Sequence, residues 1–375
     1  MIAFKKNEEI ECLRGIAILF VLFHHVAQYL IIHPNETLNL IYSRFTFWGG
    51  VDLFFVISGF VIMNSLAKTI HKPGINFLAA CKIFWTKRIF RILPVAWFWL
   101  AVYLLATIFV NYTGAFGDIY QNLKDSKAAL FQYANIYGLG CWGKDSVMSC
   151  GPNGIYWSLS LEEQFYFLIP IFVFVFRQYL AWILLGLGFF QLFQYRPEWS
   201  IGWAFRTDAL IWGVLIAIFY NSRFILKIRH LLFPKNTLFR WLIFIILFMS
   251  MAFISAKPNS ISIGTGLLAL ICSYLVLVAS FDQGYLFKEG IFKKLLLWLG
   301  MRSYSLYLTH IIVFRLSYEI LYQITPVGFQ FSSIDSYKLF LISLPILLIL
   351  SELSFRFIEV PSKKLGHKLA SKIMP

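Results

Sequence analysis

The sequence predicts an all-α, polytopic integral membrane protein with about ten transmembrane helices. Of its 375 residues, 59% are hydrophobic and 14% are charged, and the mean hydropathy is +0.72. A soluble protein of this length carries about 25% charged residues. The stretches 92–110 and 258–281 contain no charged residue, and each is long enough to cross about 30 Å of hydrocarbon as a helix. These observations exclude a soluble globular protein.

Apolar runs separated by polar segments divide the chain into ten predicted spans. The fifth is the weakest, because it is short and contains Gly186 and Gly188. No repeat or low-complexity linker interrupts the chain, so we expect one membrane domain over 1–375 with no appended extracytoplasmic domain. Arg14 breaks the first apolar run and no small-residue cleavage site follows, so the first helix is expected to stay as an anchor. The spans are 10–30, 47–66, 92–111, 158–176, 179–195, 204–220, 239–256, 261–281, 303–323 and 338–357.

Basic residues are distributed unevenly over the segments between these spans. If the N-terminus is cytoplasmic, 23 of the 33 Lys and Arg residues lie on the cytoplasmic side. Cytoplasmic loops of membrane proteins are enriched in these residues, so we expect a multi-pass protein of the cell (inner) membrane with both termini in the cytoplasm. The net charge of +15 then suits anionic membrane lipids and requires no nucleic acid.

Two ionisable residues share one face of the first span. His25 follows Arg14 by eleven positions, which is close to three helical turns and about 16 Å along the axis. Ionisable groups inside a span are costly and indicate a functional site. Counting the rise per residue places Arg14 near the cytoplasmic surface and several other charged groups in one outer layer, where we predict a shared polar cavity. The residues at this outer depth are His25, Asp52, Glu162, Glu163, Arg206 and Asp208.

The segment KRIFRILP places Arg88 and Arg91 three positions apart, just before an apolar run. Two guanidinium groups on one helix face suit a phosphate or diphosphate, which they bind with bidentate hydrogen bonds. The alternative is that both are ordinary cytoplasmic anchors, and spacing alone leaves this open.

Further candidates would support an acceptor site or the base. Ser158, Glu162 and Tyr166 recur at four-residue steps and share one face of the fourth span. The alternative for them is the polarity common at a helix start. Arg206 and Asp208 are two apart and cannot face each other, so each is expected to pair with another helix.

Two histidines and one charged pair have competing interpretations. His310 is expected about 12 Å from the cytoplasmic end of the ninth span, lining a donor channel or satisfied in the interior. His24 points about 100° away from His25 and is expected to pack or to face lipid. Arg315 and Glu319 are four apart and are expected to form an intrahelical pair.

Cysteine spacing and composition say little about chemistry. Cys141 and Cys150 lie nine apart in the long outer loop 112–157, where an oxidising compartment would allow a disulfide. No His and Cys cluster has metal-ligand spacing, so we predict no metal. The aromatic residues are interpreted as packing and interfacial belts.

Seven segments of the chain, given below in chain order, resemble those of membrane-bound acyltransferase family 3, whose members O-acylate cell-surface carbohydrates. The resemblance implies ten helices, acyl-coenzyme A (most often acetyl-CoA) as the cytoplasmic donor, and a carbohydrate acceptor, lipid-linked or free, at the outer face, such as lipopolysaccharide O-antigen or exopolysaccharide. It also implies that Arg14 and His25 are essential and that Arg88 and Arg91 bind the donor. We expect Arg14, further in, to hold the nucleotide and phosphate end of coenzyme A together with Arg88 and Arg91. The segments are Arg14 with His25, GVDLFFVISGF (50–60), KRIFRILP (87–94), WSLSLEEQFYF (157–167), FRTDALIWG (205–213), SYSLYLTH (303–310) and FIEVP (357–361).

Acyl transfer from a thioester to a hydroxyl requires a base and a group that orients it. We expect His25 to be the base, Asp52 to orient it and Glu162 to assist, with no permanently bound cofactor. An acylated His25 is the alternative mechanism. A transporter, a flippase or a polymerase of lipid-linked sugars would also have many spans with buried charge, but would not need paired arginines for coenzyme A.

Overall fold

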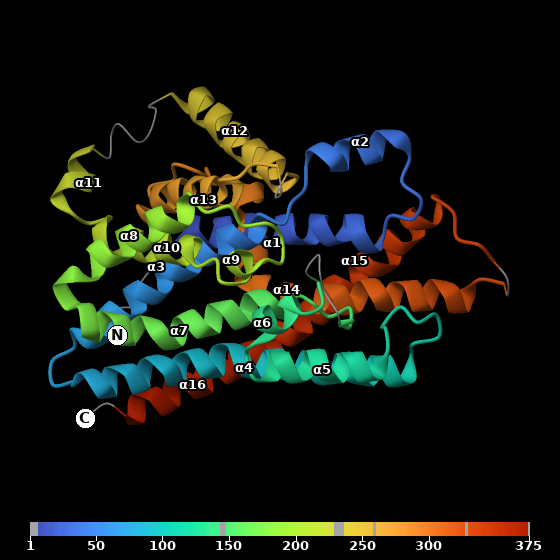
Figure 1. Ribbon diagram of the computed structural model, residues 1–375, viewed down its shortest axis with the longest axis horizontal. Helices are drawn as coiled ribbons and strands as arrows, with labels where there is room; N and C mark the ends of the chain where they lie inside the picture. Colours follow the sequence, from blue (N-terminus) through green and yellow to red (C-terminus); the bar gives the residue numbers. More distant parts are fainter. Residues whose placement is uncertain (1–6, 143–147, 229–235, 258–259, 327–328, 374–375) are drawn as a thin grey trace.

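Long helices lie side by side along the longest axis of the molecule in the computed structural model (Figure 1). The structure describes residues 7–142, 148–228, 236–257, 260–326 and 329–373, and every regular element within them is a helix. This confirms the predicted all-α fold class. The longer helices are α1 (Glu8–Tyr29), α3 (Gly50–Ile70), α4 (Phe77–Phe109), α7 (Tyr156–Phe176), α8 (Leu180–Leu192), α10 (Asp208–Phe219), α12 (Thr237–Ser255), α13 (Gly264–Ser280), α14 (Ile291–Ile324), α15 (Asp335–Ser354) and α16 (Val360–Lys372).

Shorter helices connect the long ones. They are α2 (Glu36–Arg44), α5 (Ile119–Leu130), α6 (Ala134–Leu139), α9 (Ile201–Ala204) and α11 (Arg223–Ile228), with one 3-10 turn, η1 (Arg177–Tyr179), and one π-helical turn, η2 (Phe355–Glu359). Within the described ranges, seven helical segments are long and apolar enough to cross a membrane, as a multi-pass membrane protein requires. The count of ten spans therefore stays a prediction.

Two helices begin well before the spans predicted for them. α4 starts at Phe77 and not near 92, and α14 starts at Ile291 and not at 303. Hydropathy locates only the apolar part of a helix. The helix also includes the polar residues before that part, provided that their backbone groups form the helical hydrogen bonds. Residues of these two helices therefore lie farther from the helix start than the predicted spans indicated.

Glycines allow two helix pairs to pack closely. A Cβ atom on Gly300 of α14 would lie 1.9 Å from the carbonyl oxygen of Glu11 in α1, and one on Gly59 of α3 would lie 2.1 Å from that of Leu210 in α10. Small residues at such contacts let helix backbones approach closely in membrane proteins. The first contact joins the helices that carry His25 and His310, and the second joins the helices that carry Asp52 and Asp208.

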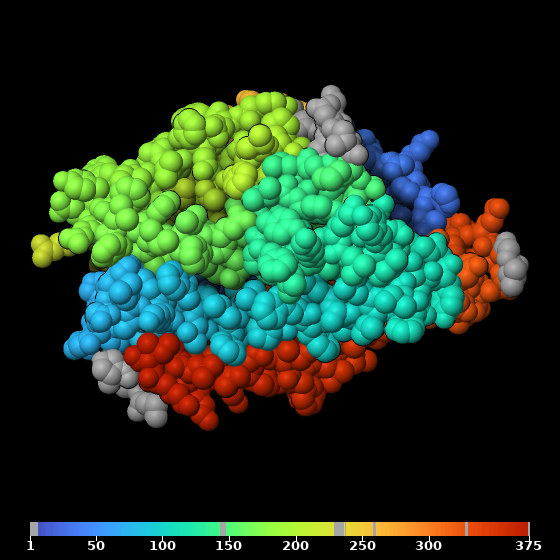
Figure 2. Space-filling view, turned by 60° about the horizontal axis from the view of Figure 1, so that its bottom comes forward, coloured from blue at the N-terminus to red at the C-terminus, as the bar shows by residue number. Residues whose placement is uncertain are grey.

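Loop helices cover one end of the bundle. Figure 2 shows α5 and α6 packed beside α4 and α7 at this end, while α16 runs along α4 on the opposite side. A disulfide joins Cys141 and Cys150, whose Cα atoms are 5.4 Å apart, as the sequence allowed.

The expected pair of Arg315 and Glu319 is wrong. Arg315 donates to the carbonyl oxygens of Ala115 and Pro152. The carboxylate of Glu319 accepts from Thr113, from both its backbone N–H and its hydroxyl. α14 extends far enough for both side chains to reach the loop after α4, and Arg315 also reaches Pro152 in the loop before α7.

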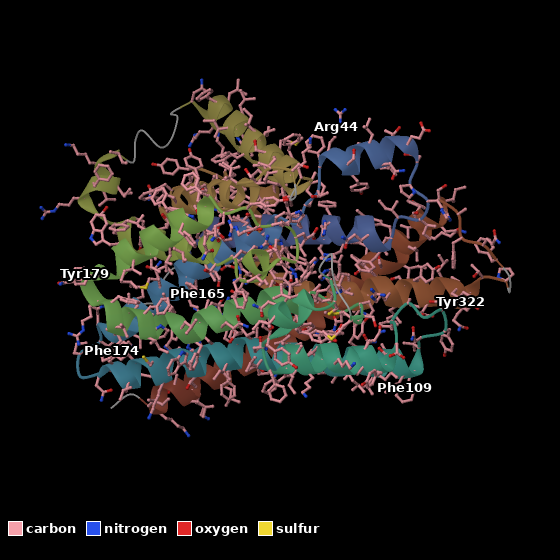
Figure 3. All side chains as sticks on the ribbon, viewed as in Figure 1. Arg44, Phe109, Phe165, Phe174, Tyr179 and Tyr322 are labelled. Atoms are coloured by element: carbon pink, nitrogen blue, oxygen red, sulfur yellow. A yellow bond between two sulfur atoms is a disulfide. The ribbon has the colours of Figure 1, made fainter. Side chains whose placement is uncertain are left out.

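Aromatic side chains are exposed at both ends of the long axis. Figure 3 shows Phe174 and Tyr179 toward one end, and Phe109 and Tyr322 toward the other. The exposed fractions of these four side chains lie between 46% and 69%. Aromatic residues at two levels are typical of the two membrane interfaces.

Candidate active site

Two cavities meet inside the helix bundle. The first has a volume of about 90 Å³ and is lined by Arg14, Arg88 and Arg91; we call it the arginine cavity. The second has a volume of about 270 Å³, and we call it the tryptophan cavity. Val51 and Tyr307 line both, so these two side chains separate the cavities. The tryptophans of the second cavity are Trp48, Trp142, Trp157, Trp199 and Trp203.

The arginine cavity gathers the three arginines that the sequence analysis assigned to a donor. Arg14 donates to the hydroxyl of Ser303 over 3.0 Å and lies 3.5 Å from the carboxylate of Glu11. Arg88 is buried, with its guanidinium 5.4 Å from the ring centre of Tyr166. Arg91 follows one turn later on α4. Three cations around one small volume suit a phosphorylated ligand.

Glu162 and Tyr166 lie on one face of α7, as predicted, and line the same arginine cavity. Tyr166 and Ser58 of α3 both hydrogen-bond to the Glu162 carboxylate. We expected Glu162 in an outer layer with His25, but the structure places it beside Arg88. Because α4 begins at Phe77, Arg88 lies about 16 Å along that helix, deeper than its position before the apolar run indicated.

Ser158, the third member of that face, lies where the cavities meet. Its hydroxyl is 2.6 Å from the phenol oxygen of Tyr307, and Tyr307 also donates to the carbonyl oxygen of Ile155 over 2.9 Å. These bonds hold the tyrosine ring in place between the arginine cavity and the tryptophan cavity.

His25 and His310 are hydrogen-bonded to each other. Nδ1 of His25 lies 2.9 Å from the carbonyl oxygen of Val21 and 3.1 Å from Nε2 of His310, whose own Nδ1 lies 2.6 Å from the carbonyl oxygen of Tyr307. A carbonyl only accepts, so each Nδ1 carries the proton. The single hydrogen on Nδ1 of His25 is then shared between the carbonyl oxygen of Val21 and Nε2 of His310, and Nε2 of His25 keeps its lone pair. That lone pair is what a general base requires.

The position of His310 corrects the depth expected for it. We expected it near the cytoplasmic end of its span, but it contacts His25 in the half of the bundle that carries the tryptophan cavity. Measured from the true start of α14 at Ile291, His310 lies about 28 Å along the helix. His24 also lines this cavity and hydrogen-bonds to Gln28, so it does not simply pack or face lipid.

Asp52 does not contact His25, so the contact predicted between them is wrong. The side chain hydrogen-bonded to His25 is His310. The carboxylate of Asp52 lies 3.5 Å from the guanidinium of Arg206, and both residues are buried. Asp208 instead accepts two hydrogen bonds from Arg196, at 2.9 and 2.6 Å. Arg206 therefore pairs with another helix, as predicted, whereas the partner of Asp208 lies in the loop between α8 and α9.

Several residues that line or support the two cavities were not predicted from the sequence. Most of them are aromatic, and the others are recognised only by their contacts in the folded protein. Trp199 and Trp203 gave a signal, because two tryptophans four apart lie just before FRTDALIWG, but they were interpreted as belts. Tyr307 lies inside the segment SYSLYLTH, and only the fold shows that it separates two cavities. Ser58, Ser303 and Arg196 gave no distinguishing pattern.

Two of the seven segments also meet directly. Ser305 donates to the Glu359 carboxylate over 2.7 Å, and both residues are buried. Glu359 ends the π-helical turn η2, a form of helix that is often found at functional sites. The predicted absence of a metal stays a prediction.

The sequence model of acyltransferase family 3, described as an acyltransferase domain, matches residues 7–357 of the chain. The chain belongs to this family. The three arginines, His25 and His310 all lie within the matched residues.

Among its relatives, the chain is 29% identical over 382 residues to peptidoglycan O-acetyltransferase OatA of Listeria monocytogenes serovar 1/2a, which covers 95% of this chain and 56% of that protein. It is 28% identical over 356 residues to O-acetyltransferase OatA of Staphylococcus aureus (strain NCTC 8325 / PS 47), with coverages of 85% and 53%. The acyltransferase-family chain thus spans about half the length of these curated relatives. No solved structure matches it.

Proposed function

We propose that the chain is a membrane O-acyltransferase that moves an acetyl group from acetyl-CoA to a hydroxyl of a carbohydrate. The observation that carries this proposal is the meeting of two cavities at Tyr307, one lined by three arginines and the other containing His25. Membership of an acyltransferase family and the names of the relatives support it.

The donor end of the site is the arginine cavity. Arg88 and Arg91 would bind the phosphates of coenzyme A from the cytoplasmic side, with Arg14 further along the path. The narrow pantetheine arm would then extend past Glu162 and Ser158 toward Tyr307. Acetyl-CoA acts here as a substrate, and the mechanism uses no permanently bound cofactor.

In the proposed reaction, Nε2 of His25 removes the proton of the acceptor hydroxyl as the oxygen attacks the thioester carbonyl. The new C–O bond forms, the C–S bond breaks, and the proton on His25 passes to the leaving thiolate of coenzyme A. While His25 is positively charged, Nε2 of His310 accepts from its Nδ1–H and holds the ring in position, the part played by a carboxylate in a triad.

The acceptor is proposed to be a glycan of the cell envelope. The Listeria relative is named for peptidoglycan, which makes peptidoglycan a candidate here beside the O-antigen or exopolysaccharide that the resemblance implied. Mass spectrometry of envelope glycans from cells with and without this protein distinguishes them, because an added acetyl group shifts the mass of one sugar only.

The activity is tested by incubating membranes that contain the protein with acetyl-CoA labelled in the acetyl group. We expect label on envelope glycan with the wild-type protein, and about 10²- to 10⁴-fold less with His25→Ala, the contribution typical of a general base. A transporter or a polymerase would give no such label. Wild-type-like transfer by a folded His25→Ala protein would show that His25 is not the base.

A further inference from the structure

The tryptophan cavity is built from indole rings that contact one another. The ring centres of Trp142 and Trp199 are 4.5 Å apart, those of Trp199 and Trp203 are 4.4 Å apart, and those of Trp203 and Trp157 are 4.3 Å apart. These four residues come from the loop after α6, the loop before α9, α9 itself and the start of α7. Segments far apart in the sequence thus form one aromatic surface beside His25.

The buried guanidinium of Arg206 supports this surface from behind. It lies 4.5 Å from the ring centre of Trp203 and 5.0 Å from that of Trp157, and its charge is balanced by Asp52. A cation on one face of an indole ring is attracted to the electrons of that ring and fixes the orientation of the ring. Arg206, from the segment FRTDALIWG, therefore positions these two rings, and Asp52 balances its charge.

Trp199 is held in a backbone conformation that is costly for its residue type. Its φ is 59°, in the left-handed region that bulky residues rarely occupy. Residues persist in such conformations where the surrounding structure holds them, and they are concentrated at functional sites. The hydroxyl of Ser200 accepts from the backbone N–H of Trp203 and starts α9, which places the two indoles in contact.

The disulfide joins two segments that line the tryptophan cavity. Trp142 follows Cys141, and Gly151 and Pro152, which also line the cavity, follow Cys150. A Cβ atom on Gly154 would lie 2.8 Å from the Trp142 ring, so only glycine at this position lets the indole lie flat against the chain.

Polar groups are present among the rings. His24, His25, Gln28 and Glu198 line the same cavity. The indole Nε1 of Trp203 is buried and has no hydrogen-bond partner among the described residues. A purely apolar ligand, such as a lipid tail, does not suit this cavity, because it would leave the buried Nε1–H of Trp203 without a hydrogen-bond acceptor.

We infer that the tryptophan cavity binds one sugar ring of the acceptor, stacked on Trp142 and Trp199 with a hydroxyl directed at His25. This rests on the proposed function, since it names the acceptor end of the same site. The C–H groups of a sugar face carry partial positive charge and meet the negative face of an indole. The hydroxyls at the edge of the ring reach Glu198 and the Trp203 N–H. A volume of about 270 Å³ lies just below the usual range of about 300–1,000 Å³ for ligand pockets, which suits a single ring.

The test uses purified full-length protein in detergent, with triacetylchitotriose and maltotriose as separate probes and saturation-transfer NMR as the measure of binding. We expect one of the two sugars to bind to the wild-type protein. Trp199→Ala should weaken that binding about tenfold, while Trp199→Phe, which keeps an aromatic face, should retain most of it. The matched control is Trp182→Ala, because Trp182 is 73% exposed on α8 and lines neither cavity.

Thermal unfolding of each variant checks its folding, and Trp142→Ala provides a second variant from a different segment. Binding that is unchanged in both Trp142→Ala and Trp199→Ala, or the absence of binding to the wild-type protein, overturns the inference. Hydrolysis of acetyl-CoA and its binding are measured in parallel and report on the donor end. Failure of sugar binding with an intact donor reaction is therefore distinguishable from failure of the proposed function.

Discussion

His310 accepts a hydrogen bond from His25 across the contact between α14 and α1, with 3.1 Å between Nε2 of the first ring and Nδ1 of the second. The same two helices approach each other closely at Gly300, where the backbone of α14 lies against that of α1. Two histidines that are 285 positions apart in the sequence therefore form one unit. In the proposed mechanism His25 exchanges a proton with the acceptor and His310 is a positioning residue.

Replacing His310 should separate positioning from folding. We expect His310→Ala to lower kcat about 10- to 100-fold, the contribution of a hydrogen bond to a charged group, with little change in KM for either substrate. His310→Gln keeps an acceptor near Nδ1 of His25 and should recover much of the loss. Steady-state kinetics of both variants are the measurement. Equal losses in Ala and Gln would mean that the ring only fills space.

Arg88 and Arg91 should contribute to acetyl-CoA affinity. Removing one guanidinium should raise the dissociation constant of acetyl-CoA about 10-fold or more. Arg88→Lys should restore less than half of the lost binding free energy, because an ammonium group cannot make the bidentate contact. Calorimetry on purified Arg88→Ala and Arg91→Ala proteins measures this. If the double variant binds acetyl-CoA normally, both arginines return to the role of cytoplasmic anchors.

Asp52 should matter chiefly for stability. Asp52→Asn leaves the buried Arg206 guanidinium without its counter-charge, and breaking such a pair costs about 3–5 kcal/mol. We expect a lower unfolding temperature in detergent. The double variant Asp52→Leu with Arg206→Met removes both charges and should recover part of this stability. A stable Asp52→Asn protein with a reduced kcat would instead favour the orienting role first predicted for Asp52.

Asp125 of α5 should make the loop region sensitive to pH. Its Oδ1 accepts from the Gly151 N–H over 3.2 Å, while its Oδ2 is buried without a hydrogen-bond partner in the described part of the chain. Burial raises the pKa of Asp125 from 3.8 to about 7. The folded protein thus binds a proton that the unfolded chain releases above about pH 4.

This stabilising contribution is therefore complete below about pH 4 and is lost as the pH rises to about 7. Asp125→Asn has the same shape and does not titrate. Thermal melts of the two proteins between about pH 4 and about pH 8 should show a fall in the wild-type unfolding temperature that is smaller in the variant. Parallel curves for the two proteins would contradict the raised pKa.

The close approach at Gly300 gives a prediction with a matched control in the same chain. Gly300→Ala places a Cβ atom against the Glu11 carbonyl and must push α14 from α1, which separates His310 from His25. We expect lower stability and a lower kcat together. A Cβ atom added to Gly186 of α8 would meet no other atom within 4 Å, so Gly186→Ala should be neutral or stabilising by up to about 1 kcal/mol. Unfolding temperature and transfer rate distinguish the two variants.

Hydropathy was enough to predict the fold class and the positions of the apolar runs. The sequence pattern also grouped Arg14 with Arg88 and Arg91, and it placed Glu162 and Tyr166 on one face. It failed where position along a helix mattered. The start of α14 at Ile291 moved His310 from the expected donor side to His25, because a helix start is set by backbone hydrogen bonds and not by hydrophobicity.

Partner choice was the second limit of the sequence. Asp52 and His25 were predicted to lie at the same depth, but depth does not specify which helices are neighbours. Because α3 packs against α10, the carboxylate of Asp52 pairs with Arg206, which lies just before α10. The tryptophans were missed for a related reason. An indole at a membrane interface and an indole in a binding cavity look alike in a sequence, and only the convergence of four segments distinguishes them.

The position of Tyr307 has an electrical consequence. If water fills both cavities, most of the membrane potential along this path falls across the thin partition formed by Tyr307 and Val51. Moving one charge through about 100 mV takes about 2.3 kcal/mol. The neutral acetyl end of the pantetheine arm would pass this partition without electrical work, whereas the phosphates of coenzyme A would remain with the arginines. A barrier one side chain thick would then admit the uncharged end of the donor and exclude its charged end.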